Sequence, residues 1–167
     1  MIYFIIGKPA SGKSTFIKNK LITKHENFKL YDDRNFLLKH ALNNKYSDMI
    51  QLTDETNFII KKIELLDNVL SEIANCLLDR TEKYSFVEFS RNNYSYCFDV
   101  IFNTIINRNS CKIIYLNTPF SICLNRNNHR KHKVPIEEMI NYFRNDDIYK
   151  VTQNYEIDFI NNNVEII

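Results

Sequence analysis

The chain of 167 residues is 44% hydrophobic and 25% charged, a composition typical of one globular domain and unlike that of disordered or fibrous proteins. Its formal net charge of +2 is too small for a protein that coats nucleic acid, and no apolar run approaches the roughly 20 residues that cross a bilayer. Only two glycines occur, Gly7 and Gly12, and both precede a lysine in one short segment. We therefore expect residues 1–167 to form a single domain whose function centres on that segment.

The four cysteines form no Cys-x-x-Cys pair and have no metal-ligand spacing. They are Cys76, Cys97, Cys111 and Cys123. We interpret them as free thiols, mostly buried, in a reducing compartment. The first residues also lack the charged segment that opens a signal peptide. The sequence therefore predicts a cytoplasmic protein without membrane association, and it gives no indication of the oligomeric state.

Short apolar runs alternate with amphipathic segments along the chain. In chain order we expect a strand at 2–6, a helix at 14–24, a strand at 28–31, helices at 35–43 and 54–80, a strand at 84–89, a helix at 98–106, a strand at 111–116, helices at 119–124 and 135–143, and strands at 156–160 and 164–167. The longest helix, at 54–80, has apolar residues every three or four positions and Thr53 as its N-cap. This alternation predicts an α/β domain with a mainly parallel sheet covered on both faces.

Residues 7–14, which read Gly-Lys-Pro-Ala-Ser-Gly-Lys-Ser, match the phosphate-binding pattern G-x-x-x-x-G-K-[ST] without a mismatch. They lie between a predicted strand and a predicted helix, where backbone N–H groups surround a phosphate. We expect Lys13 to contact the β- and γ-phosphates of ATP and the Ser14 hydroxyl to ligate Mg²⁺. The residues expected to bind ATP are Gly7, Pro9, Ala10, Ser11, Gly12, Lys13, Ser14 and Thr15.

Missing motifs narrow the class of nucleotide-binding protein. A switch GTPase needs a D-x-x-G element, for which the chain has no third glycine, and no N-K-x-D segment is present. The glycine loop of protein kinases and the dinucleotide fingerprint each need three glycines. A small phosphoryl-transfer kinase therefore fits best, and a nucleotide-binding regulator without transferase activity is the alternative.

Acidic residues follow two of the predicted strands, where ligands bind in open α/β sheets. Asp32 and Asp33 end the second strand, and one of them is a candidate general base for the attacking hydroxyl, although either also suits the N-cap of the next helix. Glu88 ends the third strand and is a candidate to hold Mg²⁺ through water or to bind substrate together with Arg91. The alternative is a structural ion pair between Glu88 and Arg91.

A basic segment spans residues 126–134 after the fourth strand's helix. Arg126 and Arg130 are four residues apart, as on one face of a helix, and Lys131 and Lys133 add two further charges. We expect this segment to be a lid whose two arginines hold the phosphates and neutralise charge in the transition state. The alternative is an ordinary solvated charged face.

Together these residues resemble P-loop kinases of the phage-type 5′-hydroxyl polynucleotide kinase group and the related nucleoside and small-molecule kinases. The likeness rests on the loop through Thr15, on the pair Asp32-Asp33, and on the R-N-x-x-R pattern from Arg126 followed by Val134-Pro135. It implies a three-layer P-loop NTPase fold with a mainly parallel sheet and a short basic lid. It also implies an aspartate base at this spacing, phosphate-clamping roles for Arg126 and Arg130, and an acceptor contact for Arg34.

The segment Phe-Val-Glu-Phe-Ser-Arg at 86–91 departs from that group, which usually has an aspartate at this strand end, and is more like small-molecule kinases. We expect transfer of the ATP γ-phosphoryl group to a hydroxyl, in first place the 5′-hydroxyl end of a polynucleotide. A nucleoside, a nucleotide or another small molecule is the alternative acceptor. Four basic residues are expected to line a channel for nucleic acid, namely Arg34, Lys39, His40 and Lys45.

Overall fold

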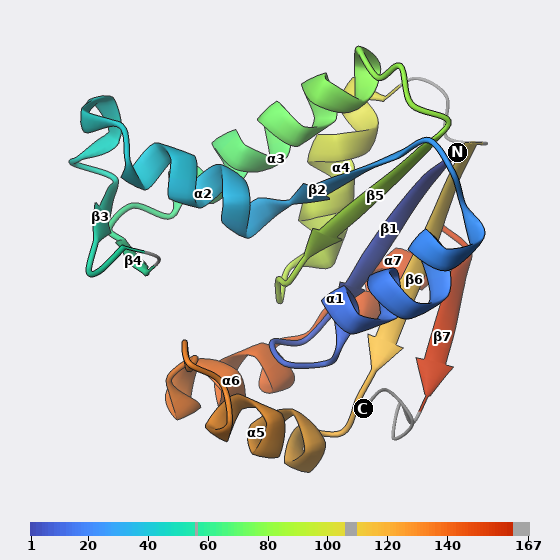
Figure 1. Ribbon diagram of the computed structural model, residues 1–167. Coiled ribbons are helices and arrows are strands. Elements are labelled where there is room, and N and C mark those ends of the chain that lie inside the picture. The colour runs from blue at the N-terminus through green and yellow to red at the C-terminus, as the bar shows by residue number, and fades with distance from the viewer. Residues whose placement is uncertain (56, 106–109, 162–167) are drawn as a thin grey trace.

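A parallel sheet with the strand order β2-β5-β1-β6-β7 forms the centre of the computed structural model, which describes residues 1–55, 57–105 and 110–161 (Figure 1). The strands are β1 (Ile2–Gly7), β2 (Phe28–Asp32), β5 (Tyr84–Phe89), β6 (Cys111–Asn117) and β7 (Ile157–Asn161). The middle strand β1 pairs with β5 on one side and with β6 on the other. This position explains the uninterrupted apolar run at its start, because a central parallel strand is covered on both faces.

Helices cover both faces of the sheet, so that the domain has three layers (Figure 1). On one face Phe4 and Ile6 belong to a large core that includes α3 (Glu64–Leu78), α4 (Tyr94–Thr104) and α7 (Ile148–Thr152). On the other face Ile5 packs with α1 (Lys13–Phe16) and with the π-helix η1 (Ile17–Leu21), which the 3-10 turn η2 (Ile22–Lys24) extends. The expected α/β domain with a mainly parallel sheet is confirmed.

The helix predicted at 54–80 is wrong over its first ten residues. Only Glu64–Leu78 form a helix, and the preceding segment belongs to an antiparallel hairpin of β3 (Ile50–Leu52) and β4 (Phe58–Ile60). Thr53 is no N-cap, because its backbone N–H donates to the carbonyl oxygen of Asn57 (2.9 Å) and closes the hairpin turn. The apolar residues of β4 also fit the apolar stripe of the helix expected here, but this agreement is by chance. The β-branched residues among them favour a strand.

Most other elements lie where they were expected, with shifted ends. The remaining helices are α2 (Asp33–Ala41), η3 (Asn44–Tyr46), α5 (Phe120–Asn128) and α6 (Ile136–Arg144). Helix α4 begins four residues before its expected start, and α5 runs four residues past its expected end, because its last residues are polar and extend no apolar stripe. Helix α7 was not predicted. The strand expected at 164–167 lies outside the described residues. No helix in the described ranges is both long and apolar enough to span a membrane.

Phe98 of α4 lies at the centre of the larger core, with its ring centroid 5.4 Å from those of both Phe4 and Phe102. The side chain is fully buried. We therefore expect Phe98→Ala to lower the free energy of unfolding by about 3–5 kcal/mol in urea denaturation. The control is Leu42→Ala, at a side chain that is 65% exposed, for which we expect a change of no more than about 0.5 kcal/mol. Equal losses for the two variants would contradict this description of the core.

Candidate active site

Both glycines of the phosphate-binding loop are required by its shape. Gly7 and Gly12 have φ angles of +151° and +97°, which side chains other than hydrogen rarely tolerate. A Cβ atom on Gly7 would also lie 2.8 Å from Ser11 Oγ and 2.9 Å from the carbonyl oxygen of Leu116. On Gly12 it would lie 3.1 Å from Arg126 Nη1. The backbone therefore requires glycine at both positions through its φ angle, and at Gly7 also through the close approach of Leu116.

Lys13 holds its ammonium group inside this loop. The Nζ atom donates hydrogen bonds to Gly7 O (3.2 Å), to Lys8 O (3.1 Å) and to Ser90 Oγ (2.6 Å). All three acceptors are neutral oxygens, and burial lowers the pKa of Lys13, which Glu88 and Asp33 oppose through their negative charges. A buried ammonium group that donates to neutral oxygens suits a phosphate as its ionic partner.

The other residues expected to bind ATP lie around this ammonium group. Pro9, Ala10 and Ser11 are buried in the loop, and Ser11 Oγ has no hydrogen-bond partner among the described residues. Thr15 is half-buried in α1. An unsatisfied hydroxyl in a loop of this shape fits a phosphate oxygen.

Ser14 and Glu88 present two oxygen atoms next to the loop. Ser14 Oγ donates to Glu88 Oε1 at 2.8 Å. Hydroxyl and carboxylate oxygens are the ligands that Mg²⁺ takes from proteins, usually with phosphate oxygens and water completing its coordination. The part of the chain that the structure describes contains no group of three or more histidine, cysteine, aspartate or glutamate residues suited to a metal. The pair therefore fits a nucleotide-bound Mg²⁺ rather than a metal held by protein alone.

The two adjacent aspartates have different partners. Asp33 Oδ2 accepts a hydrogen bond of 2.6 Å from Arg91 Nη1, and both side chains are largely buried. This contact overturns the structural Glu88–Arg91 ion pair considered as an alternative in the sequence analysis, because Arg91 turns to Asp33 instead. The guanidinium still has two buried nitrogens, Nε and Nη2, without a hydrogen-bond partner in the described residues.

Asp32 lies opposite Glu88 in the register of β2 and β5, at the carboxyl ends of both strands. Its Oδ1 atom caps α2 by accepting from the backbone N–H of Arg34 (3.0 Å). Burial in the first place, together with the negative charges of Glu88 and Asp33, raises the pKa of Asp32 to about 6. Asp32 therefore combines a capping contact with a carboxyl group that titrates close to neutral pH.

The lid segment begins inside α5 and continues as a loop. Arg126 Nη1 donates to Ser11 O at 3.1 Å, so this side chain contacts the phosphate-binding loop. Arg130 lies beyond the end of the helix, and the expected common helical face with Arg126 is not formed. Partial burial lowers the pKa of Arg130, as do the positive charges of Arg34 and Arg126, so the three guanidinium groups lie near one another.

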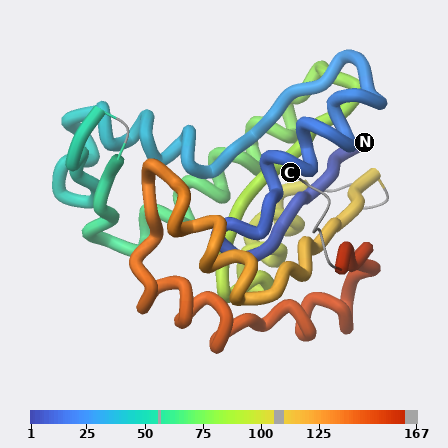
Figure 2. Tube along the Cα trace, turned by 60° about the horizontal axis from the view of Figure 1, so that its bottom comes forward, coloured from blue at the N-terminus to red at the C-terminus, as the bar shows by residue number. Residues whose placement is uncertain are grey.

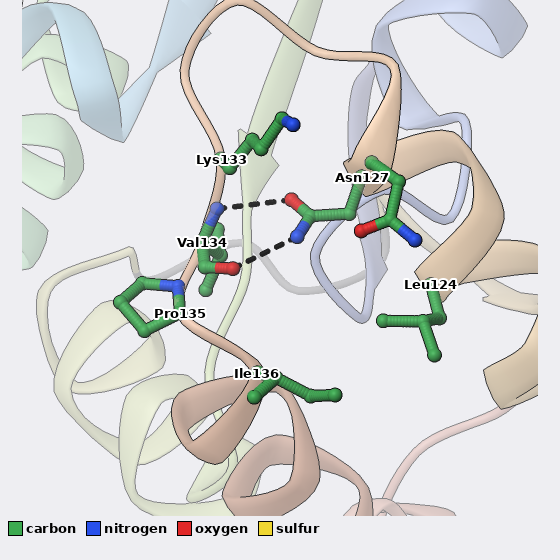
Figure 3. A pocket seen from close by; sticks show the side chains of 7 residues that line it. Leu124, Asn127, Lys133, Val134, Pro135 and Ile136 are labelled. Carbon is green, nitrogen blue, oxygen red and sulfur yellow. Dashed lines mark hydrogen bonds between the residues drawn. The ribbon is translucent and has the colours of Figure 1, made fainter.

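Asn127 fixes the base of the lid. Its side chain is buried and pairs with Val134 through two hydrogen bonds, from Nδ2 to Val134 O (2.8 Å) and from Val134 N to Oδ1 (2.9 Å) (Figure 3). A cavity of about 360 Å³ lies beside this clamp, between the end of α5 and the start of α6. The sequence analysis gave Asn127 no role. Its position between the two arginines of the lid pattern is the signal that could have identified it.

A bridge of polar side chains joins the lid to the β3–β4 hairpin. Asn57 Nδ2 lies 2.7 Å from His132 Nδ1, and Asn57 Oδ1 accepts from Arg34 Nη2 (3.3 Å). Figure 2 shows the lid segment, in orange, approaching the hairpin, in blue-green. The bridge therefore links the lid, the hairpin and Arg34 of α2. Sequence reasoning missed Asn57 because it placed this residue within a helix.

The residues expected to line a nucleic-acid channel lie in different environments. His40 is buried, with Nε2 2.8 Å from Glu72 Oε1 on α3, so it lines no channel. Lys45 is exposed and lies over the ring of Tyr46. Lys39 lines a groove of about 500 Å³ between β2 and α2, with Lys29 and Asp32 among its other lining residues.

Two further polar residues at strand ends hold the loop and were not predicted. Thr118, directly after β6, donates through Oγ1 to Ser11 O (2.9 Å), and Ser90, directly after β5, accepts from Lys13. Their position at the carboxyl edge of a parallel sheet is the signal that would have identified them. Tyr94 at the start of α4 accepts from the backbone N–H of Gly7 (3.2 Å).

Neither a protein-family model nor a curated protein sequence matches the chain. Solved structures do resemble it. A gluconokinase from Sinorhizobium meliloti 1021 matches with a TM-score of 0.62 at 18% identity, over 96% of this chain and 81% of that one. A shikimate kinase from Aquifex aeolicus matches with a TM-score of 0.55 at 15% identity, over 96% and 85%.

A chain of the Pnkp1/Rnl/Hen1 RNA repair complex matches with a TM-score of 0.61 at 14% identity, over 93% of this chain and 46% of that one. At such identities the likenesses establish a shared fold. The chain therefore has the three-layer α/β fold of P-loop kinases.

Removal of the Lys13 charge tests the phosphate-binding role of the loop. We expect Lys13→Met to reduce ATP turnover by about 100- to 1000-fold, because it removes the ammonium group that the loop carbonyls hold in place. The matched control is Lys20→Met at an exposed position of η1, which should keep wild-type turnover. Circular dichroism checks that both variants fold. Wild-type turnover in a folded Lys13→Met protein would exclude this role.

Proposed function

We propose that the protein is an ATP-dependent kinase that transfers the γ-phosphoryl group to a hydroxyl. The observation that carries this proposal is Asp32, a carboxyl group with a pKa of about 6 beside Glu88 and within the electrostatic influence of Lys13. A general base that titrates near neutral pH accepts a proton readily while remaining ionised under physiological conditions. The arginine-bound Asp33 has its charge compensated, which favours Asp32 over Asp33 as the base.

The proposed reaction is a direct in-line displacement. The loop amides and Lys13 hold the β- and γ-phosphates, and Arg126 and Arg130 neutralise charge that develops on the transferred group. Mg²⁺, held by Ser14 and Glu88, supplies charge neutralisation at the phosphate oxygens when bound. Asp32 takes the proton of the acceptor hydroxyl. The oxygen of that hydroxyl bonds to the γ-phosphorus, while the bond from the γ-phosphorus to the bridging oxygen breaks and ADP leaves. No covalent enzyme intermediate is needed.

For the acceptor, the bridge from the lid to the hairpin favours a small hydroxyl compound such as a nucleoside. The contact between His132 and Asn57 joins the lid to the hairpin beside Arg34, and a lid held in this way suits an acceptor that is taken up whole. The two Arg91 nitrogens that have no hydrogen-bond partner in the described residues are the groups assigned to its other oxygens.

The 5′-hydroxyl end of a polynucleotide is the second candidate acceptor, and the groove between β2 and α2 favours it. Asp32, Lys29 and Lys39 are among the residues that line this groove. Positive charge along an open groove that leads to the proposed base suits a phosphodiester chain whose end alone enters the site.

The role of Asp32 is tested by its pH dependence. We expect kcat/KM to fall as the pH drops below about 6, because the protonated carboxyl accepts no proton. Asp32→Asn should lose about 100- to 10,000-fold in kcat and retain ATP affinity in calorimetry. Asp99→Asn, at an exposed position of α4, is the matched control and should behave as the wild type. Full activity in Asp32→Asn would assign the proton transfer to another group.

The acceptor class is decided by transfer of label from γ-labelled ATP. The panel contains nucleosides, nucleoside monophosphates, sugars and shikimate-like hydroxy acids, together with 5′-hydroxyl DNA and RNA. We expect label in a small acceptor. Label on oligonucleotide ends alone supports the second candidate. Binding of ATP without transfer to any acceptor would identify a nucleotide-binding regulator and refute the kinase.

A further inference from the structure

The phosphate-binding loop contains a second lysine whose side chain points away from the phosphate cradle. Lys8 is 3% exposed, and its Nζ donates to the backbone carbonyl of Tyr142 (2.7 Å). The same atom forms an ion pair with Asp146. Tyr142 belongs to α6, and Asp146 lies between α6 and α7. One loop residue is thus joined to the elements that follow the lid.

Asp146 is held by partners other than Lys8. Tyr115 donates its hydroxyl to Oδ2 (2.6 Å), and the backbone N–H of Ile148 donates to Oδ1 (2.9 Å). Burial raises the pKa of Tyr115, so its hydroxyl stays protonated and remains a donor. The next residue, Asp147, has its backbone N–H bonded to Asn92 O (3.2 Å). The carboxylate therefore presents a fixed negative charge to Lys8.

The surroundings of Lys8 make Lys8 and Asp146 depend on each other's charge. The rings of Tyr94 and Phe143 have their centroids 5.9 and 5.8 Å from Nζ. Burial lowers the pKa of Lys8, and Asp146 opposes that shift. An ammonium group in this apolar setting is costly without a counter-charge, and so is the carboxylate without its cation.

The backbone of Lys8 connects this pair to Lys13. The carbonyl oxygen of Lys8 accepts from Lys13 Nζ (3.1 Å) and from the backbone N–H of Ser11 (3.1 Å). Fixing the Lys8 side chain therefore fixes a carbonyl that orients the phosphate-binding ammonium group. The two lysines have different partners, because the charge of Lys8 is neutralised by a carboxylate and the ammonium group of Lys13 contacts neutral oxygens.

We propose that Lys8 is a positioning residue, whose ion pair with Asp146 sets the loop geometry that Lys13 needs to bind the phosphates of ATP. The inference rests on the proposed nucleotide binding. It adds a contact between the loop and the connection from α6 to α7, opposite the contact that Arg126 of the lid makes with Ser11.

The test is calorimetry of Mg·ATP binding to the double variant Lys8→Met/Asp146→Asn, which removes both charges and keeps similar volumes. A buried pair replaced on both sides often leaves stability nearly unchanged. We expect a melting temperature near that of the wild type and a dissociation constant for Mg·ATP raised about tenfold or more. A purely structural pair would alter the melting temperature and leave the dissociation constant at its wild-type value, which would overturn the inference.

The matched control is Lys62→Met/Asp48→Asn, which removes an exposed ion pair in the hairpin region. It should bind Mg·ATP as the wild type does, and weakening equal to that of the buried double variant would overturn the inference. Should the buried double variant not fold, Tyr115→Phe decides, since it keeps both charges and removes one hydrogen bond to Asp146. A dissociation constant raised about three- to tenfold supports the inference, and an unchanged one overturns it. Absence of binding to the wild type would instead refute the proposed function itself.

Discussion

The buried ammonium group of Lys13 is the constraint around which the site is built. It hydrogen bonds to three neutral oxygens, two from the loop itself and one from Ser90 at the end of β5. A buried cation without a bound anion is unfavourable, and the surrounding structure must keep it in place. The glycine at position 7, the hydroxyl of Tyr94 on its amide, and Thr118 and Arg126 on Ser11 all act on the loop that holds it. These three side chains, from α4, from the residue after β6 and from α5, thus hold the loop.

The carboxylates near Lys13 also depend on their surroundings. Three carboxylates gather near this ammonium group, and their mutual repulsion requires compensation. Arg91 compensates Asp33, and the Ser14 hydroxyl donates to Glu88. Asp32 accepts a hydrogen bond from the backbone N–H of Arg34, and its pKa rises to about 6. The neighbouring aspartates therefore differ in their partners, because Arg91 contacts Asp33, and no inspection of the pair itself reveals this contact.

The sequence predicted those features that depend on local pattern. The loop, its flanking strand and helix, and the acids at the ends of β2 and β5 follow from spacing and apolar runs over short stretches. The β3–β4 hairpin was missed because the residues of β4 also fit a helical stripe, and pairing with β3 decided between the two. The partner of Arg91 and the contact between Asn57 and His132 join residues far apart in the chain, and neither leaves a signal in a single sequence.

Lys8 and Lys13 show why residue type alone does not assign a role. Both are buried lysines of one loop, five positions apart, and burial lowers the pKa of each. Their binding properties differ because Lys8 forms an ion pair with the carboxylate of Asp146, whereas Lys13 donates hydrogen bonds to uncharged oxygens. The charge that is neutralised within the protein is suited to holding the loop, and the charge left without an ionic hydrogen-bond partner is the one suited to a phosphate. In this fold, therefore, the position of the carboxylates around the loop assigns the function of its cations.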